Sequence, residues 1–169
     1  MIQISLYLVA ALVLGLGLLV LRSGPRSRTN QSFGAFVLLS AIWVLGVAFF
    51  HSGANLSFWA PMAFAATALL PATFLTFAKY FPTVNRWPSK SILLLASSIG
   101  LLFAIISLTT RWIVGDAILT PSGPTREAGP LYPIFAIYFL VAWCTALTVL
   151  ISKWTRARGL AGAQLEYLL

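Results

Sequence analysis

Few residues in this chain of 169 could do chemistry. It has one histidine, His51, one cysteine, Cys144, and three acidic residues. His51 follows an apolar run, where it could act as a single axial ligand to a haem or a chlorophyll. A lone histidine at such a place is more often a hydrogen-bonded surface group, so we expect no cofactor. A single cysteine excludes an intrachain disulfide and a cysteine-rich metal site, so we also expect no bound metal.

The charged residues avoid the middle of the apolar runs. Proton relays, ion pathways and voltage sensors need ionisable groups at mid-membrane depth. Lys79 and Lys153 both lie at the ends of apolar runs, so neither suits the Schiff base of a retinal pigment. The chain also has no set of nucleophile, base and orienting residue, and no glycine-rich phosphate loop. We therefore expect no catalytic residues and no ion-coupled transport.

The composition indicates an all-α polytopic membrane protein. The chain is 60% hydrophobic and only 8% charged, whereas a soluble domain carries about 25% charged residues. The net charge of +8 would suggest nucleic acid as the partner of a soluble protein. Here the basic residues lie between apolar runs, as in the cytoplasmic loops of membrane proteins. We therefore expect a lipid bilayer as the partner, and no nucleic acid.

Five apolar runs are long enough to cross ~30 Å of hydrocarbon as helices. They cover residues 2–21, 33–50, 58–77, 91–108 and 131–151. A further apolar segment, residues 159–169, is too short to cross, and we interpret it as the start of a sixth helix or as an interfacial segment. We treat residues 1–169 as one transmembrane helical domain, and of the two interpretations of its end we favour a sixth helix whose remainder lies past Leu169.

The basic residues are distributed unevenly over the segments between these runs. Segments on one side carry nine Lys and Arg residues, and those on the other side carry Arg111 and Arg126 alone. Loops rich in Lys and Arg stay in the cytoplasm. The sequence therefore predicts that the N-terminus lies outside the membrane and the C-terminus inside.

The longest outer segment, residues 109–130, predicts a small β-hairpin between the fourth and fifth helices. Two apolar triplets, 112–114 and 117–119, flank Gly115 and Asp116. A Gly-Asp pair between two short apolar runs is typical of a hairpin turn. We expect the rest of the segment, residues 121–130, to be irregular.

Aromatic and polar residues gather at the predicted outer ends of the helices, and such groups can line a pocket between helices. The group comprises Phe50, His51, Trp59, Trp112, Tyr132 and Tyr138. Apart from Phe50, we take them as candidate ligand-binding residues. The alternative is an aromatic belt combined with ordinary packing.

Two further features concern how the helices pack. Pro71 lies in the middle of the third run, where a proline removes one helical hydrogen bond and favours a kink. Ala96, Gly100 and Ala104 repeat every four residues on one face of the fourth run. Small residues at this spacing let another helix approach closely, either within the chain or in a dimer.

Several short segments carry a family resemblance. They are Asn30–Phe33 with Trp43, Pro71–Phe77 with Phe81-Pro82, Gly129–Tyr132, and Arg158-Gly159 with Gln164 and Tyr167–Leu169. Together they resemble the N-terminal seven-helix membrane sensor region of bacterial histidine kinases. The resemblance covers five helices and the start of the sixth, and it implies a multi-pass location in the bacterial inner membrane.

The resemblance implies a sensory and signal-coupling module that is not itself catalytic. In the family a seventh helix leads to cytoplasmic signalling domains, so kinase activity would belong to a longer parent protein. Lys153, Arg156, Arg158 and Gln164 are then the candidates for passing the signal inward, with a homodimer or other membrane subunits as partners. The alternative is an accessory subunit of a pigment-protein or respiratory complex.

Overall fold

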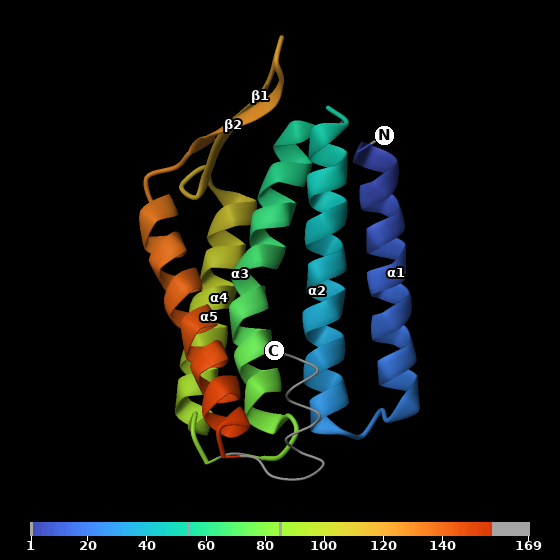
Figure 1. Cartoon of the computed structure of the whole chain (residues 1–169). Helices are drawn as coiled ribbons and strands as arrows, with labels where there is room; N and C mark the ends of the chain where they lie inside the picture. Colours follow the sequence, from blue (N-terminus) through green and yellow to red (C-terminus); the bar gives the residue numbers. More distant parts are fainter. Residues whose placement is uncertain (1, 54, 85, 157–169) are drawn as a thin grey trace.

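The computed structural model describes residues 2–53, 55–84 and 86–156. These residues form five long helices and one two-stranded hairpin (Figure 1). In chain order the elements are α1 (Ile2–Ser23), α2 (Arg28–His51), α3 (Leu56–Tyr80), α4 (Lys90–Thr109), β1 (Val114–Thr120), β2 (Gly123–Ala128) and α5 (Tyr132–Trp154). All five helices are long and apolar enough to span a membrane. The segment 159–169 lies outside the described residues.

Each of the five predicted runs is a helix, and local capping explains why some helices begin before the apolar run. Ser27 caps α2, where its side chain accepts a hydrogen bond from the backbone N–H of Asn30 at 3.4 Å. Ser89 caps α4 in the same way, accepting from Ile92 at 3.3 Å. Such caps satisfy a backbone donor that the first turn leaves unpaired. Polar residues such as Thr29 and Gln31 are therefore part of α2.

Helix α3 is the centre of the bundle. It packs against α2, α4 and α5, whereas α1 packs mainly against α2. One end of the bundle, here called the hairpin end, holds the start of α1, the α2–α3 turn and the hairpin (Figure 1). The opposite end, here called the basic end, holds the α1–α2 loop, the α3–α4 loop and the end of α5. Apart from Arg111 and Arg126, the described Lys and Arg residues lie at the basic end, while the side of the membrane on which this end lies stays a prediction.

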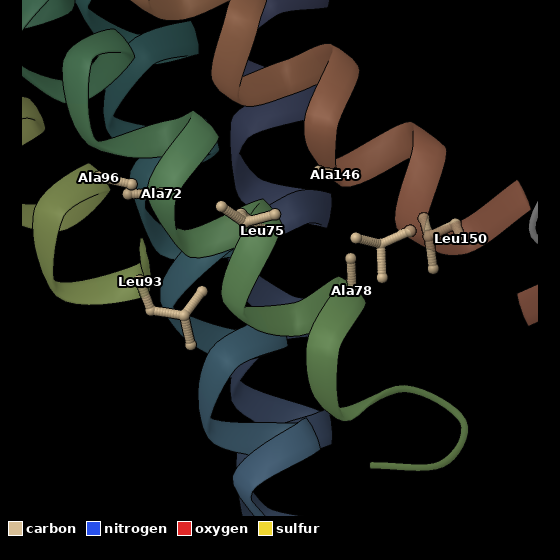
Figure 2. Packing of buried hydrophobic residues seen from close by; sticks show 8 residues of the cluster. Ala72, Leu75, Ala78, Leu93, Ala96, Ala146 and Leu150 are labelled. Carbon is tan, nitrogen blue, oxygen red and sulfur yellow. The ribbon is translucent and has the colours of Figure 1, made fainter. Parts of the chain in front are cut away.

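Alanines let the neighbouring helices approach α3 closely. Its buried residues include Ala60, Ala65, Ala68, Ala72 and Ala78, which carry little side-chain bulk. Toward the basic end, Ala72, Leu75 and Ala78 pack with residues of α4 and α5 (Figure 2). The other members of this cluster are Leu93, Ala96, Ala146, Val149 and Leu150. A second cluster, centred on Phe103 and Phe135, lies toward the hairpin end.

The hairpin is present, but its predicted turn is wrong. The strands pair in antiparallel fashion with Thr120 opposite Gly123, so the turn is Pro121-Ser122. Gly123 has φ +118°, a conformation that glycine adopts without strain. The Thr120 hydroxyl donates to the Gly123 carbonyl at 2.7 Å and closes the turn.

The predicted turn residues Gly115 and Asp116 belong instead to β1. The register shifts there, because Val114 pairs with Ala128 and the next pair is Ala117 with Arg126. One extra residue on β1 makes this a bulge, another place where glycine is common. The expected irregular segment is also wrong in part, because residues 123–128 form β2. Arg126 is therefore a strand residue that faces the bundle.

Helix α3 continues through Pro71 as a single helix. Pro71 is fully buried, and the Thr73 hydroxyl next to it donates to the carbonyls of Leu69 and Leu70 at 3.2 and 2.9 Å. A kink at Pro71 stays a prediction.

Candidate functional site

A cavity of about 290 Å³ lies at the hairpin end between α2, α3 and β2; we call it the Arg126 pocket. Its wall is mostly aromatic and apolar, with one cation. The lining residues are Trp43, Val47, Phe50, His51, Ala60, Ala63, Phe64 and Arg126. The guanidinium carbon of Arg126 lies 4.3 Å from the ring centre of Phe64 and 5.2 Å from that of Tyr132. At these distances both rings attract the cation.

A second cavity, of about 360 Å³, lies beside the Arg126 pocket between α2, α3 and α5. Trp43 and Phe64 belong to the walls of both cavities. The remaining lining residues are Thr67, Tyr132, Phe135, Ala136, Phe139 and Leu140. A shift of α5 would therefore change the second cavity directly and the Arg126 pocket through Tyr132.

The five candidate ligand-binding residues do not meet in one pocket. His51 lines the Arg126 pocket and Tyr132 lines the second cavity. Trp59 stacks on Phe49 of α2 with ring centres 4.3 Å apart. Trp112 lies before β1 and is 56% exposed. Arg126 and Phe64, which join the hairpin to α3, are not among the residues that the sequence marks as ligand-binding candidates.

Tyr138, the fifth candidate, joins three helices in the middle of the bundle. Its hydroxyl lies 3.0 Å from the Ala68 carbonyl of α3 and 3.1 Å from the Ala96 carbonyl of α4. Gly100 makes room for this contact, because a Cβ there would lie 2.6 Å from the Tyr138 hydroxyl and 2.8 Å from the Ala68 carbonyl oxygen. Ala96, Gly100 and Ala104 are all buried, so this face of α4 packs within the chain, against α3.

An apolar groove of about 410 Å³ runs between α4 and α5, beside Tyr138. Both helices pack on α3, and they contact each other through side chains such as Phe103 and Tyr138 rather than through close backbones. The groove lining is aliphatic and aromatic, apart from the Tyr138 hydroxyl and Thr145. This surface offers no charged group to a ligand.

At the basic end, Lys153 ties α5 to the α3–α4 connection. Its side chain is buried, and Nζ donates toward four carbonyl oxygens that belong to the end of α3 and the loop after it. The acceptors are Ala78 at 2.6 Å, Lys79 at 2.9 Å, Phe81 at 2.7 Å and Thr83 at 2.7 Å. The last carbonyls of a helix lack intrahelical partners and attract cations. Lys153 thus caps α3 from a neighbouring helix.

A second buried lysine strengthens this connection. Lys79 is 7% exposed, and its Nζ donates to the Pro88 carbonyl just before the Ser89 cap of α4. The sequence places Lys79 and Lys153 at the ends of apolar runs, among the basic residues of the predicted cytoplasmic side, and Lys153 is also a signal-coupling candidate. The structure adds that both are buried near the ends of their helices, where their charges face backbone oxygens.

The remaining candidates stand apart from these sites. Arg156 is exposed just after α5, and Arg158 and Gln164 lie outside the described residues. Cys144 is exposed on α5. Within residues 2–53, 55–84 and 86–156, no three His, Cys, Asp or Glu residues are placed to share a metal ion. The absence of a cofactor stays a prediction.

The comparisons with known proteins give one match. The family model for the N-terminal 7TM region of histidine kinase matches residues 5–169. No curated protein and no solved structure matches the chain. The match gives no support to an accessory subunit of a pigment-protein or respiratory complex. Since it spans nearly the whole sequence, the chain belongs to the family of N-terminal seven-helix membrane regions of histidine kinases.

Proposed function

We propose that this chain is the sensory and signal-coupling part of a histidine-kinase-linked membrane receptor, and that it has no catalytic role of its own. One observation carries the proposal beyond family membership: α5 connects the cavities of the hairpin end to the buried Lys153 of the basic end. Tyr132 at its start lines a cavity, and Lys153 near its end holds the α3–α4 connection. Its 23 residues would span about 34 Å as a helix.

The signal would travel as a change in packing of α5 against α3. Occupation of a hairpin-end cavity would favour one position of Tyr132 and hence of the whole helix. Lys153 would then move relative to the carbonyls of Ala78 and Thr83, or carry the α3–α4 connection with it. A ligand shifts such an equilibrium only by the difference between its affinities for the two packings. Arg156, just after α5, would pass the motion into the cytoplasm.

The test measures phosphorylation in membranes that contain the intact native protein, with every domain it has in the cell. Incubation with radiolabelled ATP should produce acid-labile phosphohistidine on this protein or on a partner that co-purifies with it. Lys153→Met should change the labelling rate several-fold, because it releases the end of α5. Lys90→Met is the control, since Lys90 is an exposed lysine at the same end. Absence of phosphohistidine, or equal rates for both variants, would contradict the proposed function.

We also propose that the protein lies in the bacterial inner membrane with its hairpin end outside. The gathering of Lys and Arg at the basic end supports this orientation. Single cysteines at Ser27, in the α1–α2 loop, and at Ser122, in the hairpin turn, test it in a Cys144→Ala background. An impermeant thiol reagent should label the cysteine at 122 in intact cells and spare the one at 27. The reverse pattern would show that the orientation is wrong.

A further inference from the structure

Arg126 holds a partly buried positive charge at the hairpin end, and no described carboxylate pairs with it. Its guanidinium makes cation–π contacts with Phe64 and Tyr132. Among the described residues it takes part in no ion pair and no hydrogen bond. A guanidinium carries five N–H donors in a rigid plane. An aromatic ring attracts the cation but accepts no conventional hydrogen bond, so the N–H donors of Arg126 stay available to another group.

The nearby carboxylates are directed elsewhere. Asp116 forms an exposed ion pair with Arg111. Glu127 follows Arg126 directly on β2, and successive side chains of a strand point to opposite faces. The described part of the hairpin end therefore presents the Arg126 pocket with a cation but no carboxylate, so the pocket favours a negatively charged ligand.

The other walls of the pocket indicate what the rest of that ligand is like. Trp43, Phe50 and Phe64 supply flat apolar surfaces, and His51 adds a polar group at the rim. The volume of about 290 Å³ is near the lower end of the range for small-molecule sites. With one permanent cation, the pocket balances one negative charge. A carboxylate also matches the spacing of guanidinium donors, which can bind both of its oxygens.

We propose that the Arg126 pocket binds a small monocarboxylate with a flat apolar body, and that this is the input site of the sensor. The carboxylate would accept hydrogen bonds from the edge of the guanidinium, and the apolar body would lie against Trp43 and Phe50. Bound there, it would fix Arg126 relative to Tyr132, the residue at which α5 begins. This assignment of the input rests on the proposed sensory function, whereas the binding itself does not.

Equilibrium dialysis with radiolabelled phenylacetate tests the binding directly. It uses the intact native protein in nanodiscs of neutral lipid, so that no anionic lipid competes. Phenylacetate should bind saturably at millimolar concentration or below. Unlabelled phenylacetamide, which has the same body without the charge, should not displace it. If decanoate competes better than phenylacetate, the pocket binds a lipid-derived carboxylate, and the proposal of a flat apolar body is wrong. If inorganic phosphate competes as well as phenylacetate, the apolar body does not contribute to binding, and the proposal is also wrong.

Three variants locate the bound molecule. Arg126→Gln should weaken phenylacetate binding about tenfold or more, since it removes the charged donor fork. Val47→Phe fills the pocket from α2 while Arg126 itself is retained, and it should weaken binding to a similar degree. Arg111→Gln removes a cation at the same end that lies outside the pocket, and it should leave binding unchanged. Arg126→Gln also removes the contacts of Arg126 with α3 and α5, so it could weaken binding by displacing the hairpin. Val47→Phe retains Arg126 and therefore controls for this effect.

The outcomes separate this inference from the proposed function. No saturable binding of phenylacetate, or equal binding by Val47→Phe and the unaltered protein, would overturn the pocket assignment, even where phosphorylation responds to Lys153→Met. If phenylacetate binding depends on Arg126 and Val47, the pocket assignment is supported. If bound phenylacetate then leaves the phosphorylation rate unchanged, the pocket is not the input site.

Discussion

At the basic end, Lys153 directs its ammonium group at four carbonyl oxygens between 2.6 and 2.9 Å away. At the hairpin end, Arg126 lies over two aromatic rings and forms no ion pair with a described residue. Both side chains bring a positive charge against the helices, but only the first is surrounded by acceptors. The lysine fixes the position of the elements it joins, whereas the arginine keeps donors for another molecule.

The difference follows from what the backbone offers at each end. Near Lys153, α3 ends at Tyr80 and leaves its last carbonyls without helical partners. Near Arg126, β1 and β2 pair backbone groups with each other across the hairpin, and α3 presents the ring of Phe64. The carbonyl oxygens at a helix terminus accept hydrogen bonds from the N–H groups of a cation. An aromatic ring attracts the cation but accepts no conventional hydrogen bond from those N–H groups. Fixed geometry at one end and open donors at the other agree with the sensory function that we propose, with input at the hairpin end and output at the basic end.

The largest effect is expected for Lys153→Met, which tests whether the lysine fixes the basic end. The change removes the ammonium and leaves several carbonyls of residues 78–83 without a donor, at an expected cost of about 3 kcal/mol in unfolding free energy. The thermal unfolding midpoint, followed by circular dichroism in detergent, should fall by several degrees. Lys90→Met, at an exposed site of the same end, should leave the midpoint nearly unchanged. Equal midpoints for the two variants would show that Lys153 does not hold α5.

A smaller loss is expected for Gly100→Ala, which tests the connection between the two ends. The new Cβ would meet the Tyr138 hydroxyl and the Ala68 carbonyl at less than 3 Å, so α4 must move away from α3 and the Tyr138 side chain must shift. Overpacking of this kind costs about 2 kcal/mol. Gly15→Ala is the matched control, because a Cβ at Gly15 meets no atom within 4 Å. If Gly15→Ala lowers the stability as much as Gly100→Ala does, the loss in Gly100→Ala is not caused by overpacking.

The five helices followed from the sequence because uncharged runs of sufficient length have few alternatives. A run such as residues 91–108 contains no charge and must hydrogen-bond its backbone internally in a bilayer. The ends were harder to predict. Thr29 and Gln31 belong to α2 because Ser27 caps the helix before them, and hydropathy does not register a cap. The turn was misplaced since Gly115-Asp116 fits a turn and a bulge equally well, whereas Pro121-Ser122 beside Gly123 was the correct signal.

The candidate site was harder to predict than the fold, because side-chain partners come from other elements. Tyr132 and Tyr138 are six residues apart on one helix, so they point in different directions around its axis and cannot share a pocket. Lys153 follows an apolar run, and this pattern does not distinguish a buried lysine from one that extends its side chain to the membrane interface. Its acceptors are backbone oxygens of residues 78–83, which carry no sequence signature. Arg126 became a candidate only when β2 placed it over Phe64.

The smallest effect is expected for the exposed ion pair at the hairpin end. Arg111 and Asp116 have side chains that are 78% and 59% exposed, and such pairs contribute about 0–1 kcal/mol. A double-mutant cycle with Arg111→Ala and Asp116→Ala should therefore give a coupling energy near the bottom of that range, about 0.5 kcal/mol or less. Thermal unfolding of the two single variants and the double variant measures it.

The reason for this expectation is that the hairpin is attached by apolar burial rather than by charge. Ile113 and Val114 are 0% and 2% exposed and belong to the cluster around Phe103 and Phe135. Ile113→Ala should therefore lower the unfolding midpoint far more than either charge variant, since it leaves a cavity in that cluster. A coupling energy well above 1 kcal/mol would mean that charge holds the hairpin. Arg126 would then be better explained as a second fastening of the hairpin than as a donor kept for a ligand, and the contrast between the two ends would disappear.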